Sequence, residues 1–221
     1  MSAPVQTNLA TEQKQTVVDD QGRVSDSAST IDQEQEYRAG AYSLLAVLLR
    51  SIPEQNLLDY LKALSDVPGK GDELSVTMSM LGLAARNCNR DSVDDEYHNL
   101  FIGLGRGELV PYGSWYLTGF LMEKPLALLR RDLAALGFER NADTSEPEDH
   151  VAALCEVMSL LINEGRAHEE QARFFEMHMA SWLGRFFSDL SHAKTAVFYR
   201  AVGRFGYAFA EFEQQYLSMK V

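Results

Sequence analysis

The chain has 221 residues, 46% of them hydrophobic, which is enough to bury a core in one domain or in two small helical lobes. The formal net charge is -12. Because a nucleic-acid binder normally carries a basic face, this charge argues against nucleic acid as a partner and favours a positively charged one. The polar N-terminus resembles no export signal and no apolar run is long enough to cross a bilayer, so we expect a cytoplasmic protein without stable membrane insertion.

The first segment, residues 1–33, is rich in Ser, Thr, Gln and Asp and has almost no large apolar side chains. Such a segment cannot bury enough apolar surface to offset the conformational entropy that ordering would cost. The sequence therefore predicts a disordered acidic tail ahead of the folded part.

Helical periodicity begins at Tyr37. Tyr37, Ala41, Leu44 and Leu48 are spaced by four, three and four residues, which is the apolar stripe of an amphipathic helix, and Pro53 ends it. Apolar spacing and Pro or Gly breaks predict three further helices in this half of the chain: 57–64, 74–85 and about 91–102.

The stretch 103–114, with the sequence GLGRGELVPYGS, is too rich in glycine for regular structure. A helical pattern resumes near Trp115 and again over 124–136, where Gly137 suits a C-cap. A polar connector follows at 139–146. Ser145 and Glu148 have the spacing of a capping box, which predicts a helix start with Pro147 in its first turn.

The last part of the chain predicts three helices. One presents an apolar face from Val151 to Leu161, a second runs from Gln171 to Phe186, and the third carries aromatic residues from Phe198 to Tyr216 at spacings of four and three. No stretch alternates as a half-buried strand does, so the predicted class is all-α. We expect an N-terminal helical lobe (34–138), a hinge (139–150) and a C-terminal helical lobe (151–221).

Catalytic patterns are incomplete in this chain. His168-Glu169-Glu170 begins like a zinc-protease helix, but residue 172 is Ala where the second His is needed. The glycines at 103–107 follow a helix and lack the Lys-Ser/Thr of a phosphate loop. Cys88 and Cys155 are far apart and are expected to be small buried residues. We therefore expect no metal site, no cofactor and no enzyme.

Two constellations remain. In the first, a helix leads into the glycine-proline loop, and Leu100, Phe101, Pro111 and Tyr112 either line an apolar groove or belong to a core helix and its exit turn. The second is SEPEDH, residues 145–150, which is either an ordinary helix start or a set of polar groups suited to a cationic ligand.

Together these constellations resemble the TorD/DmsD family of molybdoenzyme maturation chaperones. The first is similar to the family's Tyr-x-x-Leu-Phe-x-Gly segment and the turn after it, and the matching residues are Tyr97, Leu100, Phe101, Gly103, Pro111, Tyr112, Gly113 and Ser114. The second is similar to the family's Glu-Pro-Asp-His hinge, here Glu146, Pro147, Asp149 and His150 with Glu148 inserted. A third match is the helix that carries Gln171, Phe174, His178 and Trp182.

The resemblance covers roughly residues 37–217 and implies a two-lobe, all-helical fold with a hinge, as a monomer or a domain-swapped dimer. It implies a chaperone that binds the twin-arginine leader, the apoenzyme or both, of a molybdopterin-dependent oxidoreductase, and delays export until the cofactor is inserted. It also implies weak guanine-nucleotide binding. The insertion of Glu148 leaves the role of each hinge side chain open.

A leader with two guanidinium groups and an apolar stretch needs an apolar groove with carboxylates at its rim. Our hypothesis is that Leu100, Phe101, Pro111 and Tyr112 receive the apolar stretch, with Glu146, Asp149 and Glu148 toward the arginines. Tyr97, Gly103, Gln171, Phe174, His178 and Trp182 are expected to support the site from the core. The alternatives are a general helical interaction module and a metal- or nucleotide-dependent helical enzyme.

Overall fold

The computed structural model describes residues 26–64, 71–104, 106–139 and 146–219. Within these ranges the chain is helical, and its only pairing of extended backbone is an isolated bridge between Tyr112 and His150. The helices are α1 (Asp26–Arg50), α2 (Gln55–Leu64), α3 (Glu73–Arg86), α4 (Arg90–Tyr97), the π-helix η1 (His98–Ile102), α5 (Gly113–Thr118), α6 (Lys124–Leu136), α7 (Val151–Asn163), α8 (His168–His178), α9 (Leu183–His192) and α10 (Phe198–Ser218). The predicted all-α class is confirmed.

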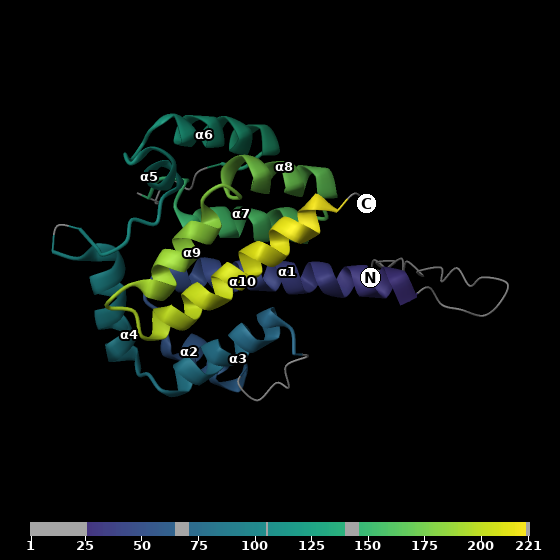
Figure 1. Ribbon diagram of the computed structural model, residues 1–221. Coiled ribbons are helices and arrows are strands. Elements are labelled where there is room, and N and C mark those ends of the chain that lie inside the picture. Colours follow the sequence, from purple (N-terminus) through teal and green to yellow (C-terminus); the bar gives the residue numbers. More distant parts are fainter. Residues whose placement is uncertain (1–25, 65–70, 105, 140–145, 220–221) are drawn as a thin grey trace, which may run out of the picture.

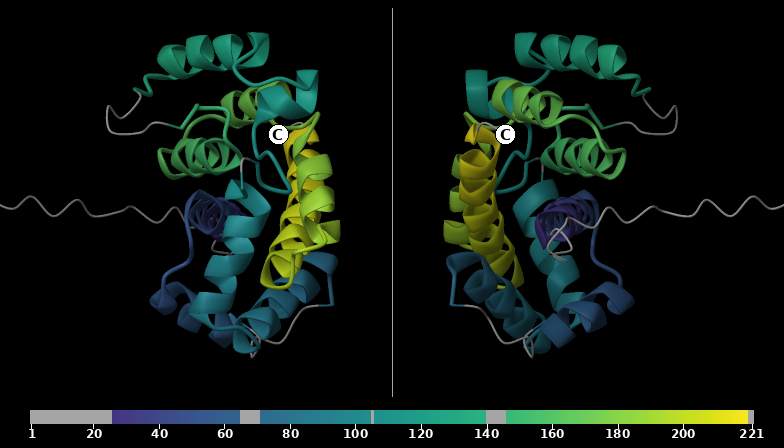
Figure 2. Two further views of the ribbon diagram at one scale, coloured as in Figure 1. Left: turned by 90° about the vertical axis from the view of Figure 1, so that its left-hand side faces the viewer. Right: turned by 90° about the vertical axis from the view of Figure 1, so that its right-hand side faces the viewer.

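The centre of the molecule is formed by α1, α7, α9 and α10. Helix α1 packs along α7, α10 packs along α9, and α10 also reaches α3. Helices α2 and α3 lie at one end of the molecule and α5, α6 and α8 at the other (Figure 1, Figure 2). The two predicted lobes therefore share one apolar core, and their division at 139–150 stays a prediction.

Helix α1 begins at Asp26, so residues 26–33 of the predicted tail have helical backbone. Once a helix is nucleated, each added residue gains a backbone hydrogen bond, so polar residues can extend it at little cost. The predicted tail over residues 1–25 lies outside the described residues.

The predicted helix over 91–102 is confirmed, with a change of geometry along its length. Asn89 caps α4 by accepting a hydrogen bond from the Ser92 backbone N–H, while the Ser92 hydroxyl accepts one from the Asn89 N–H. From His98 the backbone widens into η1 and ends at Gly103.

The predicted helix start with Pro147 in its first turn is wrong, and Ser145 of the predicted capping box lies outside the described residues. Helix α7 begins only at Val151, and its N-cap is His150, whose ring nitrogen Nδ1 accepts a hydrogen bond from the Ala152 N–H. Residues 148 and 149 form a turn because the backbone there is bonded to the Tyr112 segment.

The single helix predicted from Gln171 to Phe186 is two helices, α8 and α9, separated by a turn at Met179–Trp182. The Trp182 indole N–H donates to the His178 carbonyl oxygen at 2.8 Å, which is the acceptor a continuous helix would offer to the Trp182 backbone N–H. The apolar and aromatic residues keep a spacing of four through this turn, so their periodicity did not predict a break.

Both cysteines are free thiols. Cys155 is buried as expected, whereas Cys88 is only half-buried at the edge of the core. Burial raises the pKa of both thiols. Across the described residues, none of the helices is long and apolar enough to span a bilayer.

Candidate functional site

Two segments that are far apart in the sequence meet at the start of α7. Tyr112 and His150 form the isolated antiparallel bridge, and next to it the Gly113 N–H donates to the Asp149 carbonyl oxygen at 2.9 Å. The proline-aromatic turn before α5 and the predicted hinge motif are therefore joined through their backbones. Residues 111–114 of the first constellation and the hinge motif therefore lie together, and their role as one binding site stays a prediction.

Asp149 is the buried centre of this site. Its side chain is 3% exposed, and its Oδ2 accepts a hydrogen bond from the Ser114 backbone N–H at 2.8 Å, in the first turn of α5. The other carboxylate oxygen, Oδ1, and the Ser114 hydroxyl are both buried and have no hydrogen-bond partner among the described residues. Buried polar atoms are normally hydrogen-bonded, so both oxygens call for a hydrogen-bond partner from water or from a ligand.

Both residues line a hollow of about 140 Å³ between α5, α6, α7 and α8. The remaining lining residues are mostly apolar: Gly113, Leu117, Pro125, Leu128, Leu129, Leu154, Met177 and His178. Three large apolar side chains on three different helices are exposed at the rim, with Leu117 at 45%, Leu128 at 45% and Met177 at 54%. The hollow thus combines a buried carboxylate oxygen with an exposed apolar rim.

The His150 side chain holds the start of α7 in place. Besides capping α7, its ring meets the Tyr112 ring edge to face, with centroids 5.0 Å apart. Burial lowers the pKa of His150 to about 4, although Glu146 and Asp149 act to raise it. Burial outweighs the two acids, so the ring is neutral near pH 7.

The acids before Asp149 are engaged at the surface. The Tyr112 hydroxyl donates to the exposed Glu146, and Arg130 on α6 forms an ion pair with Glu148 at 2.9 Å. Burial and Glu146 together raise the Tyr112 pKa. Pro147, between these acids, is half-buried.

The residues predicted to receive the apolar stretch lie deeper than expected. Leu100 is 0% exposed and Pro111 is buried, so neither offers surface to a ligand in this conformation. Phe101 is half-buried against the rings of Tyr97 and Tyr199, at centroid distances of 5.0 and 5.4 Å. Contact between these side chains and a leader stays a prediction. The apolar side chains exposed around the hollow are those of Leu117, Leu128 and Met177.

Gly103 and Tyr97 support the loop that leads to the site. Gly103 has a φ of 59°, and a Cβ atom there would lie 2.1 Å from the Arg106 carbonyl oxygen, so the turn requires glycine. Tyr97 is buried and its hydroxyl donates to the Leu49 carbonyl oxygen at 3.4 Å.

The segment of the third predicted match packs against the site through Trp182 and His178. Trp182 is 1% exposed and stacks on Tyr116, and a Cβ atom on Gly113 would lie 3.2 Å from its indole ring. His178 pairs with Asp132 at 3.0 Å and also lines the hollow. Burial lowers the His178 pKa, against the opposing effect of Asp132.

Gln171 and Phe174, on the same helix, are buried away from the hollow. Gln171 accepts a hydrogen bond from Arg38 at 2.8 Å and donates one to the Arg166 carbonyl oxygen at 2.9 Å. Phe174 is 3% exposed. Both residues are structural in this conformation.

The rim of the hollow could not be identified from the sequence. Leu117, Leu128 and Met177 lie on predicted helices, but their periodicity does not reveal which apolar side chains remain uncovered. One sequence signal was available: the run Phe120-Leu121-Met122 follows Gly119 directly, and all three side chains are exposed. Apolar runs at the surface mark interaction sites.

The chain is similar in sequence to known proteins. A family model described as the nitrate reductase delta subunit matches residues 70–188, more than half of the chain. The chain is 26% identical over 191 residues to the chaperone protein TorD of Aliivibrio salmonicida, covering 80% of this chain and 89% of the relative. It is 27% identical over 197 residues to chaperone protein TorD of Vibrio cholerae, covering 80% and 90%.

Among solved structures, the fold is similar to that of a protein from Archaeoglobus fulgidus described as a redox enzyme maturation protein. The TM-score is 0.52 at 18% sequence identity, over 80% of this chain and 93% of that chain. The named relatives are chaperones, which supports a chaperone of redox-enzyme maturation and not a catalyst. The chain belongs to the nitrate reductase delta subunit family, the family that includes the TorD chaperones.

Proposed function

We propose that this chaperone binds the twin-arginine leader of a molybdopterin-dependent oxidoreductase and that the Asp149 hollow takes up an arginine side chain of that leader. By holding the leader in the cytoplasm, the chaperone delays export until the cofactor has been inserted into the apoenzyme. The observation that carries the proposal is the pair of buried oxygen atoms on Asp149 and Ser114 that have no hydrogen-bond partner in the part of the chain that the structure describes.

The chemistry of these atoms selects a cationic donor. A carboxylate oxygen can only accept hydrogen bonds, and leaving it buried without a donor costs about 1–3 kcal/mol. A guanidinium group has five N–H donors and makes charge-assisted bonds to carboxylates. Ser114 Oγ, beside Asp149, offers a second acceptor in the same hollow.

The rim fits the apolar part of a leader. Leu117, Leu128 and Met177 are exposed around the hollow, and Phe120 and Met122 add exposed apolar surface in the loop after α5. Methionine adapts to apolar partners of different shape because its side chain is flexible and polarizable. An arginine in the hollow would therefore place the following apolar residues on this rim.

The test is calorimetric titration of the purified chain with leaders of molybdoenzymes from the same organism. Each leader is compared with a scrambled version and with an Arg-Arg→Lys-Lys version. We expect Asp149→Asn to weaken binding of the intact leader about 10- to 100-fold, since a hydrogen bond to a charged group contributes about 1.5–3 kcal/mol. The substituted amide keeps an oxygen for the Ser114 N–H, so the circular dichroism spectrum should be unchanged.

The matched control is Asp189→Asn, which removes a carboxylate that accepts a hydrogen bond from the exposed Tyr116 hydroxyl. This variant should bind the leader as the wild type does. If Asp149→Asn binds the leader with wild-type affinity, the hollow does not bind an arginine of the leader. Equal affinity for intact and scrambled leaders would favour a general helical interaction module.

A further inference from the structure

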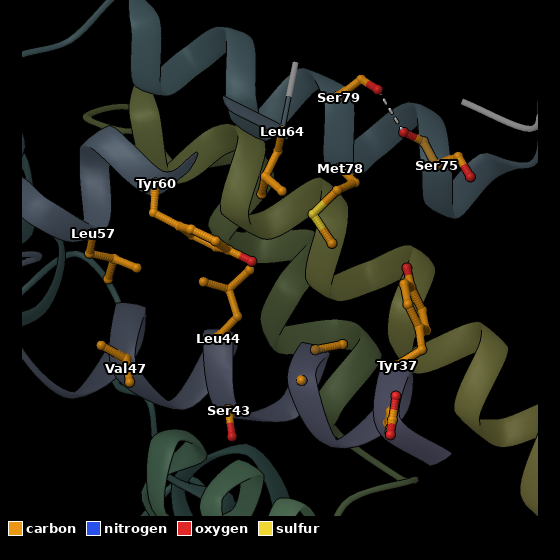
Figure 3. A pocket seen from close by; sticks show the side chains of 13 residues that line it. Tyr37, Ser43, Leu44, Val47, Leu57, Tyr60, Leu64, Ser75, Met78 and Ser79 are labelled. Atoms are coloured by element: carbon orange, nitrogen blue, oxygen red, sulfur yellow. Dashed lines mark hydrogen bonds between the residues drawn. The ribbon is translucent and has the colours of Figure 1, made fainter. Parts of the chain in front are cut away.

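A second and larger hollow lies between α1, α2 and α3, at the end of the molecule away from α5 and α6 (Figure 1). Its volume is about 520 Å³. Leu44 from α1, Leu57 and Tyr60 from α2, and Met78 from α3 point into it (Figure 3). We call it the α1–α3 groove.

The groove exposes large apolar side chains from two helices. Val47 is 51% exposed, Tyr60 is 62% exposed and Tyr37 is 42% exposed. Aromatic side chains in an apolar depression are typical of the residues that dominate protein–protein binding energy. The groove therefore has the composition of an interaction surface.

The serine side chains in the groove already have partners within the protein. Ser43 and Ser159 share a hydrogen bond of 2.8 Å, the Ser75 hydroxyl donates to Asp72 at 2.9 Å, and the Ser79 hydroxyl donates to the Ser75 carbonyl oxygen at 3.0 Å. An occupant consequently gains little by presenting hydrogen-bonding groups to them. Apolar contact is the main interaction that the floor offers.

One end of the groove is acidic. Glu36 lines it, and none of the lining residues that the structure describes is Lys or Arg. Asp72 at the N-cap of α3 lies close enough to Tyr37 to contribute to raising its pKa to about 12, after the larger effect of burial. We call Glu36 and Asp72 the acidic end. An occupant with a basic residue at this end would be complementary in charge.

We propose that the α1–α3 groove docks an amphipathic helix of a client protein, with its apolar face on the groove floor and a Lys or Arg at the acidic end. A helix satisfies its own backbone groups, whereas a peptide bound as a β-strand would need a sheet edge, and none exists among the described residues. From Tyr37 to Val47 the floor follows α1 for about 15 Å at 1.5 Å per residue, which matches about three turns of a docked helix.

Two other occupants are disfavoured by charge. A second copy of this chain carries a net charge of -12, and the segment over residues 1–25 has Glu12, Asp19 and Asp20 against Lys14 and Arg23. Either would bring net negative charge toward Glu36 and Asp72. The proposal goes beyond leader binding, because it concerns a different surface and a different part of the client.

The probe is a fluorescein-labelled, 15-residue amphipathic peptide with Leu on one face and Lys-Arg at one end, titrated into the full chain and followed by fluorescence anisotropy. The groove variant is Val47→Glu/Tyr60→Glu, and the control variant is Leu83→Glu/Tyr207→Glu, which alters an exposed aliphatic residue and an exposed tyrosine outside the groove. We expect at least tenfold weaker binding to the groove variant and less than a twofold change in the control. Replacing Lys-Arg by Glu-Glu in the peptide should weaken binding about fivefold.

Circular dichroism and urea unfolding of both variants establish that each is folded. Equal affinity of the groove and control variants, or equal affinity of the basic and acidic peptides, would overturn the proposal. Tenfold tighter peptide binding after deletion of residues 1–25 would assign the groove to that segment, and a dimer in sedimentation that only the groove variant abolishes would assign it to a second copy.

A leader titration separates this proposal from the Asp149 site. We expect the groove variant to bind the twin-arginine leader as the wild type does, whatever the strength of that binding. Loss of leader binding in the groove variant alone would place the leader in the groove and overturn docking of a client helix there.

Discussion

The guanidinium of Arg38 and the carboxylate of Glu213 form a bidentate ion pair inside the protein, with 2.6 Å between Nε and Oε1 and 2.9 Å between Nη2 and Oε2. Both side chains are 0% exposed. The pair joins α1 to α10, and Gln171 and Tyr42 complete it with hydrogen bonds of 2.8 and 2.9 Å. The first and last helices are thus held together by one saturated polar cluster.

Replacing Arg38 with Met should destabilise the protein by about 3–5 kcal/mol, because it leaves the Glu213 carboxylate buried without its cation. Urea unfolding followed by circular dichroism measures the change. The control is Arg50→Met, which breaks the half-exposed pair with Glu156 and should cost less than about 1 kcal/mol. If both substitutions cost the same, the buried pair contributes no more than a surface pair does.

Glu96 on α4 caps α10, the last helix, which is far away in the sequence. Its two carboxylate oxygens accept backbone N–H groups of Val197, Phe198 and Tyr199 at 2.7, 2.9 and 2.6 Å, where α10 begins. The first N–H groups of a helix have no partner within it, so this carboxylate replaces that partner and also faces the positive end of the helix dipole.

We expect Glu96→Ala to lower the free energy of unfolding by about 2–3 kcal/mol, since it leaves buried donors unpaired. Glu108→Ala is the matched control, because Glu108 accepts the Lys194 and Thr195 N–H groups in the same way but at an exposed position. Its effect should be below about 1 kcal/mol, as water can replace the lost acceptor. A larger loss in the control would argue against burial as the reason.

Gly203 allows α9 and α10 to approach closely. A Cβ atom at this position would lie 2.5 Å from the Ser191 backbone nitrogen and 2.9 Å from the Phe187 carbonyl oxygen. Gly203→Ala should therefore cost about 3 kcal/mol, because backbone atoms of α9 must move. Thermal unfolding of this variant and of Gly40→Ala tests the explanation.

A Cβ atom on Gly40 meets nothing within 4 Å, and Gly40 lies within helix α1. Gly40→Ala should consequently stabilise the protein by about 0.5–1 kcal/mol through the lower entropy of the unfolded chain. Destabilisation by both substitutions would show that something other than the close approach of α9 and α10 is responsible.

The pKa of His150 predicts a loss of stability in mild acid. Burial lowers the folded-state pKa to about 4, so between pH 6.5 and 4 the unfolded chain binds a proton at this residue and the folded protein does not. The resulting loss begins below about pH 6.5 and amounts to at most about 3 kcal/mol by pH 4.

His150→Asn keeps an N-cap acceptor for α7 but removes the titrating ring. Urea unfolding of the wild type and the variant at several pH values between 7 and 4.5 isolates the effect. The stability of the variant should fall less steeply with decreasing pH. Parallel curves would mean that the His150 ring is protonated in the folded protein as readily as in the unfolded chain.

Local patterns were sufficient for most of the helices. The spacing of Phe198, Val202, Phe205 and Phe209 predicted α10 because the period of an α-helix is a property of adjacent turns and needs no knowledge of neighbours. Likewise, the sequence motifs included both segments that meet in the candidate site, residues 111–114 and 146–150. The break between α8 and α9 escaped this reasoning because Trp182 competes for a carbonyl acceptor without disturbing the spacing.

The environment of those residues depends on the packing of the whole fold. The backbone N–H of Ser114, which is distant in sequence, binds Oδ2 of Asp149, while Oδ1 is buried without a partner among the described residues. The pKa of His150 is lowered because the segments packed around the ring exclude water. In the same way, Leu44 belongs to an apolar stripe whether its face is covered or open. Local sequence patterns were therefore enough to predict most helices and the motifs. Which side chains remain accessible to a ligand depends on the packing of distant segments, because burial is set by the neighbours that the fold brings together.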